Sequence, residues 1–257
     1  MTKLVNYRVY GAENPTSIYI LHGIFGMLDN WHLLAKKLAE RHRVVSFDAR
    51  NHGHSFHSNS NTYNEMCSDL KQLMHHLNDK MGILLGHSMG GKTAMRFAHL
   101  YPEMTKQLIV VDIAPKAYAP SHLNYFRAFK EVPLHTLGSR KEIELAFEPY
   151  APDRVVRQFI VKNIVSNASG GYTLKTNIEA IERYYEEIVG ELPIESSCLK
   201  KTDFVCGSNS NYVNEEDEQA ILQHFPNARF HRVNNAGHWV HADNPQGFFD
   251  CLQGILH

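Results

Sequence analysis

Gly86-His87-Ser88-Met89-Gly90 fits the pattern G-x-S-x-G, and the residues on either side give the match its meaning. Residues 81–85 are short and apolar, which predicts a buried strand, and residues 91–100 predict a helix. Glycines two residues before and two after a serine let the backbone turn very tightly. The sequence therefore predicts a sharp strand-to-helix turn that exposes the Ser88 hydroxyl beside the electropositive start of a helix.

The chain has 257 residues, which suits one α/β domain with a well-buried core. It carries 26 Lys and Arg against 27 Asp and Glu, with no basic run, so neither nucleic acid nor a membrane surface is expected as a partner. The N-terminus lacks the apolar core of a signal peptide, and no apolar run could span a bilayer, so we expect a cytoplasmic location. Four widely spaced cysteines predict free thiols: Cys67, Cys198, Cys206 and Cys251.

Short apolar runs alternate with longer helical patterns, which indicates a mainly parallel sheet flanked by helices. Core strands are expected at residues 17–21, 43–48, 81–85, 106–112, 202–206 and 229–233. Residues 4–10 are a candidate antiparallel edge strand. Further helices are expected at residues 29–40, 63–77 and 246–256.

The alternation stops between about residue 115 and residue 200, where helical patterns occur without a strong core strand. We expect residues 115–200 to form a helical cap over a core made of residues 1–114 and 201–257. Most aromatic residues of the cap should form its own small core, and a few should face the cleft, since binding pockets are largely apolar. These aromatic residues are Tyr118, Tyr125, Phe126, Phe129, Phe147, Tyr150, Phe159, Tyr172, Tyr184 and Tyr185.

A serine hydroxyl becomes a good nucleophile when a base removes its proton, and the base is usually a histidine oriented by a carboxylate. With this type of turn the chain order is Ser, then Asp or Glu, then His. His238 follows the sixth core strand by a short loop, whereas His241 lies near the expected start of the last helix. We therefore expect His238 to be the base.

Two regions offer a carboxylate. The loop after the fifth core strand often carries the acid, but here it has none before Glu215, Glu216 and Asp217, which resemble the first turn of a helix. Asp112 ends the fourth core strand, beside the strand that leads to the serine. We favour Asp112, which keeps the order Ser, Asp, His, and retain the later carboxylates as the alternative.

An oxyanion hole needs backbone donors, usually two. We expect one to be the Met89 amide, and the other to come from residues 22–26, where Ile24 or Phe25 could supply it. We favour Phe25. The side chains of Ile24 and Phe25 are also expected to bind substrate, together with His87 and Trp239.

Together these segments resemble the α/β-hydrolase superfamily, and within it the bacterial YbfF-type serine esterases. The resemblance rests on residues 22–31, 48–55, 86–92, 111–115 and 236–241, and spans nearly the whole chain. It implies a small cytosolic serine esterase that acts on short acyl esters, with reach to acyl-CoA thioesters, and that needs no metal or organic cofactor. It also implies an acid after the strand that precedes the cap, which supports Asp112.

The sequence thus favours a serine carboxylesterase that hydrolyses short- to medium-chain acyl esters through a Ser-His-Asp triad and an acyl-enzyme. An acyl-CoA thioesterase with the same triad is one alternative, and a non-catalytic ligand-binding protein on the same fold is another. A zinc enzyme is a third, because His52, His54 and His57 have nearly the spacing of an H-x-H-x-D-H motif. Phe56 stands where that motif needs aspartate, so we expect no metal.

Overall fold

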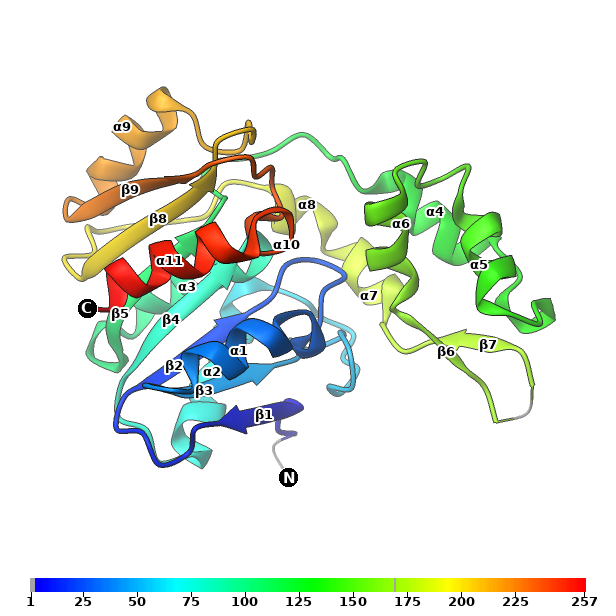
Figure 1. The fold of residues 1–257 in the computed structure, drawn as a ribbon, viewed down its shortest axis with the longest axis horizontal. Helices are drawn as coiled ribbons and strands as arrows, with labels where there is room; N and C mark the ends of the chain where they lie inside the picture. The colour runs from blue at the N-terminus through cyan, green and yellow to red at the C-terminus, as the bar shows by residue number, and fades with distance from the viewer. Residues whose placement is uncertain (1–2, 169) are drawn as a thin grey trace.

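A seven-stranded sheet forms the centre of the computed structural model, which describes residues 3–168 and 170–257 (Figure 1). Its strands are β1 (Tyr7–Tyr10), β2 (Ser17–Leu21), β3 (Arg43–Phe47), β4 (Gly82–His87), β5 (Thr105–Val111), β8 (Lys201–Gly207) and β9 (Ala228–Val233). Their order is β1-β3-β2-β4-β5-β8-β9. Only β1 is antiparallel to its neighbour. The expected core strands and edge strand are confirmed, with ends shifted by a few residues.

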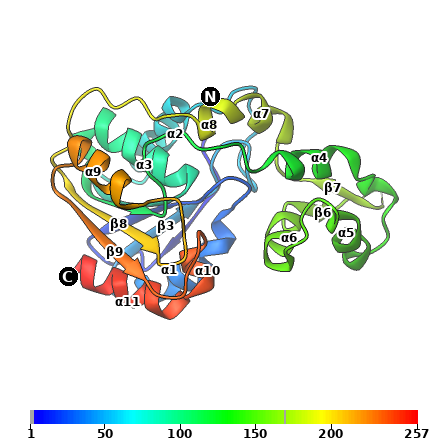
Figure 2. The same cartoon turned by 90° about the horizontal axis from the view of Figure 1, so that it is seen from above.

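Helices cover both faces of the sheet, because alternate residues of each strand point to opposite faces (Figure 2). Ile18 and Ile20 share a cluster with the helices of one face, while Tyr19 and Leu21 share a cluster with those of the other. The first face is covered by η1 (Leu28–Trp31), α1 (His32–Leu38), α10 (Val240–Asp243) and α11 (Pro245–Leu256). The second is covered by α2 (Tyr63–His76), α3 (Met89–Leu100) and α9 (Glu215–His224).

Between β5 and β8 the chain leaves the sheet and forms a separate group of elements beyond the carboxyl ends of the strands (Figures 1 and 2). These are α4 (Leu123–Glu131), η3 (Leu134–Thr136), α5 (Arg140–Phe147), α6 (Arg154–Val161), β6 (Ile164–Ser166), β7 (Tyr172–Leu174), α7 (Ile178–Arg183) and α8 (Tyr185–Val189). The β6–β7 hairpin was not expected, because strands of three residues are too short to show a periodic pattern. We call this group the cap, and propose residues 115 and 200 as its limits.

Aromatic side chains join the cap to the core. Phe126, Phe129 and Phe147 are buried in the same cluster as Phe25, which comes from the loop after β2. The Phe25 ring lies 5.1 Å from Phe126 and 5.5 Å from Phe129, centre to centre. Part of the cap's aromatic core is therefore shared with the loop that is expected to form the oxyanion hole.

The four cysteines are free thiols, as predicted. Within residues 3–168 and 170–257, no helix has both the length and the apolar character needed to cross a bilayer.

Several of the 17 histidines are buried in the core. Burial lowers the pKa of His52 and of His241 to about 3. Nδ1 of His52 lies 2.9 Å from the Arg50 carbonyl oxygen, and the His241 ring stacks on Trp31 at 4.1 Å. Both side chains are therefore neutral in the folded protein near neutral pH, whereas histidines of the unfolded chain titrate near pH 6.5.

Acid is therefore expected to destabilise the fold. As the pH falls through about 6.5, histidines of the unfolded chain bind protons, whereas His52 and His241 of the folded protein stay neutral. The free energy of unfolding therefore falls as the pH falls. His52 and His241 should each account for about 2 kcal/mol of the loss between pH 7 and pH 5. Urea titrations at pH 7 and pH 5 measure the difference in unfolding free energy. His52→Gln should reduce the loss of unfolding free energy by about 2 kcal/mol. His54→Gln, at an exposed histidine, should leave the loss unchanged. Equal losses in the wild type and both variants would refute this explanation.

Candidate active site

Ser88 occupies a strained turn between β4 and α3. Its φ of 52° and ψ of −120° are rarely adopted by a residue with a side chain. Glycines make the turn possible, because a side chain at either position would collide with backbone. A Cβ on Gly86 would lie 2.2 Å from the carbonyl oxygen of Gly90, and a Cβ on Gly90 would lie 2.2 Å from the carbonyl oxygen of Leu21. The neighbouring backbone thus requires glycine at both positions.

Gly90→Ala is expected to destabilise the protein by about 3 kcal/mol or more, because the added methyl group would displace the β2 backbone. Gly254→Ala is the matched control, since Gly254 lies on α11 and a Cβ there meets no atom within 4 Å. The control should be neutral or more stable by up to about 1 kcal/mol, from helix propensity alone. Thermal unfolding of both variants measures the difference, and equal stabilities would contradict the close approach.

Asp112 and His238 are hydrogen-bonded, with 2.8 Å between Asp112 Oδ2 and His238 Nδ1. Asp112 directly follows β5, is fully buried, and has a φ of 51°. Two further groups donate to its carboxylate: the Gly207 amide at 3.2 Å and the Ser210 hydroxyl. The carboxylate is therefore held in one orientation, with one oxygen directed at the imidazole.

The alternative carboxylates make other interactions. Asp217 accepts hydrogen bonds from the Asn214 amide at 2.9 Å and from Lys116 Nζ at 2.7 Å, at the start of α9. Glu215 and Glu216 are exposed in the same turn. The loop that lacks an acid instead provides the Ser210 hydroxyl that donates to Asp112. The geometry therefore favours Asp112 as the partner of His238.

Two further contacts hold His238, one to its ring and one to its backbone. The Tyr212 ring stacks on it, with 3.6 Å between ring centres and 15° between planes. His87 Nε2 donates to the His238 carbonyl oxygen at 2.8 Å. Burial lowers the pKa of His87 well below its usual value, so His87 is a neutral donor that holds the histidine loop. Neither Tyr212 nor Ser210 was predicted from the sequence, because neither lies in a recognisable motif.

Ser88 and His238 line one cavity of about 320 Å³. No hydrogen bond joins their side chains in the described structure, and such bonds often tighten only when substrate binds. All four expected substrate-binding residues, Ile24, Phe25, His87 and Trp239, line the same cavity. From the cap come the aromatic side chains Tyr125 and Phe159, together with Ser121, His122, Val156 and Ile160.

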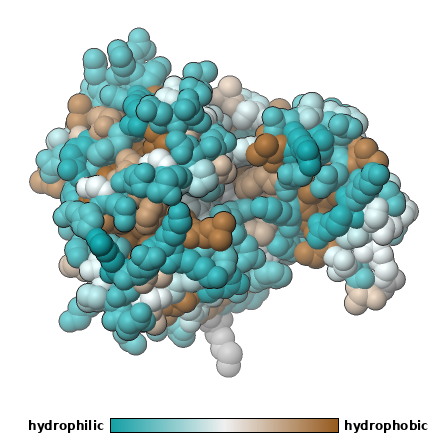
Figure 3. All heavy atoms as spheres, viewed as in Figure 1, coloured by the Kyte–Doolittle hydropathy of each residue, from teal (hydrophilic) through white to brown (hydrophobic). Residues whose placement is uncertain are grey.

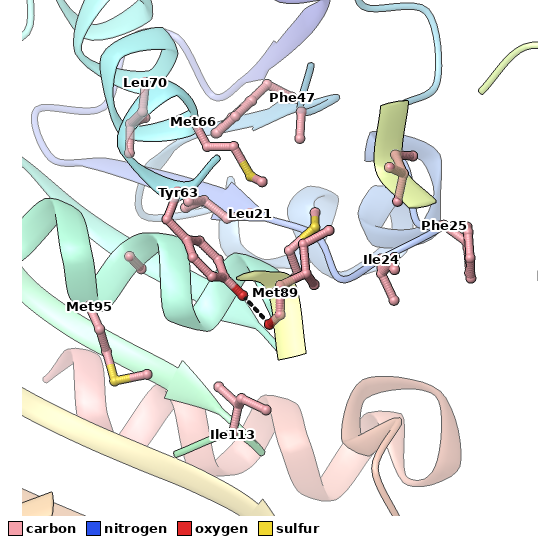
Figure 4. Packing of buried hydrophobic residues seen from close by; sticks show 14 of the residues in the cluster. Leu21, Ile24, Phe25, Phe47, Tyr63, Met66, Leu70, Met89, Met95 and Ile113 are labelled. Carbon is pink, nitrogen blue, oxygen red and sulfur yellow. Dashed lines mark hydrogen bonds between the residues drawn. The ribbon is translucent and has the colours of Figure 1, made fainter. Parts of the chain in front are cut away.

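The expected oxyanion donors are available. Neither the Met89 nor the Phe25 amide donates a hydrogen bond to another described residue, and the same is true of Ile24. Phe25 has a φ of 58°, and its carbonyl accepts from Asn163 Nδ2 at 2.8 Å, which fixes its backbone. The Met89 side chain is buried near Leu21 (Figure 4). Met89 can therefore offer its amide, while its side chain anchors the turn.

A groove of about 640 Å³ adjoins the cavity and shares with it Asn30, Phe159, Trp239 and His241. Its other lining residues are Leu33, Leu34, Lys36, Lys37, Val155, Gln158, Lys162, Ala242, Pro245 and Phe248. The lining thus combines apolar side chains with three lysines and no carboxylate. Apolar side chains also lie among polar ones on the face between core and cap in Figure 3.

The histidines of the possible zinc motif are dispersed. His52 is buried, His54 is exposed, and His57 Nε2 lies 2.9 Å from the Lys175 carbonyl oxygen. The part of the chain that the structure describes contains no group of three or more His, Cys, Asp or Glu placed to hold a metal ion.

The fold and the serine turn are those of a hydrolase, and comparison with known proteins agrees. The chain matches the alpha/beta hydrolase fold family over residues 16–245. The sn-1-specific diacylglycerol lipase ABHD11 of Danio rerio is 36% identical, over 98% of this chain and 82% of its own. Esterase YbfF of Escherichia coli (strain K12) is 31% identical over 98% of both chains. A solved marine microorganism esterase has a TM-score of 0.95 and 33% identity, and covers 99% of this chain and 100% of its own. The chain therefore belongs to the α/β-hydrolase fold family, and the resemblance to YbfF-type esterases is confirmed.

Proposed function

We propose that this protein, a hydrolase that acts on ester bonds, is a serine carboxylesterase for short- to medium-chain acyl esters. The observation that carries the proposal is the 2.8 Å bond between Asp112 and His238, at a cavity that Ser88 also lines. A cavity of about 320 Å³ lies at the small end of the range for small-molecule sites, which favours a modest acyl group.

The proposed mechanism uses only side chains and amides of this chain. Ser88 Oγ attacks the ester carbonyl while His238 Nε2 takes its proton, and Asp112 keeps the other imidazole nitrogen protonated and stabilises the imidazolium. The Met89 and Phe25 amides bind the oxyanion. His238 then gives the proton to the departing alcohol, and water activated by the same histidine releases the acid from Ser88. The proposed mechanism uses no metal or organic cofactor. We also propose that the protein is located in the cytoplasm.

A series of p-nitrophenyl esters from acetate to palmitate tests this function. We expect the highest kcat/KM between about four and eight acyl carbons and a decline for longer chains, because the cavity is small. A maximum at palmitate would contradict the proposed substrate range. Binding of esters without any turnover would favour the non-catalytic ligand-binding alternative.

Acyl-CoA thioesters are a second candidate substrate class, and the lysine-lined groove favours them. Lys36 and Lys162 are exposed, and they form no ion pair with a described residue. The groove meets the catalytic cavity at Trp239 and His241, close in sequence to the histidine that would protonate the leaving group. A thiol leaving group that carries phosphates would complement these lysines.

Removing both lysines should weaken use of acyl-CoA selectively. Lys36→Ala/Lys162→Ala is expected to raise KM for hexanoyl-CoA by about 10-fold, as two exposed charge pairs are lost, with KM for p-nitrophenyl hexanoate unchanged. Lys80→Ala/Lys106→Ala, on exposed lysines outside the groove, should change neither value. Equal effects on both substrates, or none on the thioester, would exclude this role for the groove.

A further inference from the structure

Three rings form a continuous stack that leads from the cap to the candidate catalytic base. Tyr118 lies near the start of the cap, between β5 and α4, and its ring stacks on Tyr212 at 5.2 Å with 26° between planes. Tyr212 in turn stacks on the His238 imidazole at 3.6 Å. Tyr212 lines the catalytic cavity, whereas Tyr118 does not. Tyr118 is therefore placed to act on His238 through Tyr212 and not by direct contact.

The Tyr118 hydroxyl connects two loops of the site. It donates to the Tyr212 carbonyl oxygen at 2.8 Å and accepts from the Ala114 amide at 2.8 Å. The directions are fixed, because a carbonyl can only accept and an amide can only donate. Ala114 lies two residues after Asp112, so this hydroxyl bridges the loop of the carboxylate and the loop of the stacked ring.

Lys92 also contacts Tyr118. Its ammonium group lies 5.1 Å from the centre of the Tyr118 ring, and the side chain is buried on α3, four residues after Ser88. Nζ donates to the carbonyl oxygens of Lys116, at 2.8 Å, and of Gly190. Lys116 lies between β5 and α4, and Gly190 directly follows α8, so one buried side chain holds the first and last parts of the cap beside the helix of the nucleophile.

The hydrogen bond to Asp112 fixes only Nδ1 of the side chain, so small coupled rotations about χ1 and χ2 still let the plane of the imidazole rock. A flat ring in contact with its face removes this freedom. We propose that Tyr118 is a positioning residue: through Tyr212 it holds the plane of the His238 imidazole, and thus the direction of Nε2 toward Ser88. The inference rests on the proposed function, and it makes turnover depend on a residue that never touches the substrate.

Two substitutions at Tyr118 separate its ring from its hydroxyl. Tyr118→Leu removes the stacked ring and should lower kcat by about 10- to 100-fold, the effect of a slightly misplaced catalytic group, while KM stays within about twofold. Tyr118→Phe keeps the ring and loses the bridge, so it should recover most of kcat. Tyr150→Leu, on a cap tyrosine that lies outside the cavity and the stack, is the control and should retain wild-type values.

Proton NMR of the His238 Nδ1–H signal provides a second readout. The signal should be sharp in the wild type and in Tyr118→Phe, and broadened in Tyr118→Leu, because a rocking ring exchanges its proton with water more rapidly. Unchanged kcat in Tyr118→Leu, or a raised KM at constant kcat, would overturn the inference. If Tyr118→Leu does not fold, a wild-type kcat with a broadened signal in Tyr118→Phe would overturn it equally. The proposed function fails separately, if turnover by the wild type does not depend on Ser88.

Discussion

Ser88→Ala is expected to lower kcat/KM for p-nitrophenyl butyrate by about 10⁴-fold or more, because no other group can form the acyl-enzyme. The residual activity of Ser88→Ala should be the slow catalysis that substrate binding and oxyanion stabilisation provide without a nucleophilic serine. Removal of one hydroxyl leaves the Cβ and the turn intact, so the thermal unfolding temperature should be close to that of the wild type.

The exposed Ser197 provides the control for this substitution. Ser197→Ala should keep wild-type kcat/KM, and both variants should have the same circular dichroism spectrum as the wild type. Activity of Ser88→Ala within tenfold of the wild type would exclude Ser88 as the nucleophile.

Asp112→Asn is expected to lower kcat by about 10⁴-fold, the loss seen when a triad carboxylate becomes an amide. Three donors meet this carboxylate: the Gly207 amide, the Ser210 hydroxyl and the His238 imidazole. An amide has one accepting oxygen and an NH₂ group that only donates, so it cannot satisfy all three. The imidazole would then adopt the wrong tautomer or lose its orientation. Steady-state kinetics with p-nitrophenyl butyrate measures the effect.

Asp217→Asn tests the alternative acid in the same assay. It removes the ion pair with Lys116 and part of the cap of α9, so it should cost about 1 kcal/mol of stability and leave kcat unchanged. The opposite pattern, with Asp217→Asn inactive and Asp112→Asn active, would move the acid to the start of α9.

The sequence predicted the sheet well, because parallel buried strands are apolar runs with clear limits. It also predicted the serine turn, since Gly86 and Gly90 each lie so close to neighbouring backbone that an added Cβ would be 2.2 Å from a carbonyl oxygen. The helix expected at residues 29–40 begins as the short η1 turn before α1, because helix ends depend on local hydrogen bonds that periodicity does not show.

The arrangement around His238 was less accessible to sequence analysis. Asp112 could be proposed from chain order, but the stack of Tyr118, Tyr212 and His238 joins three loops distant in sequence. Nothing local distinguishes a stacked tyrosine from any other tyrosine. The lysine-lined groove was missed for the same reason, because α1, α6 and α10 meet only in the folded chain.

The central claim is that Ser88 carries the acyl group during turnover. Intact-protein mass spectrometry after rapid acid quenching of a reaction with p-nitrophenyl butyrate tests it most directly. We expect a butyryl adduct that peptide mapping assigns to Ser88 and that is missing from Ser88→Ala. Steady turnover with no adduct on Ser88, or with the adduct on another residue, would contradict the account.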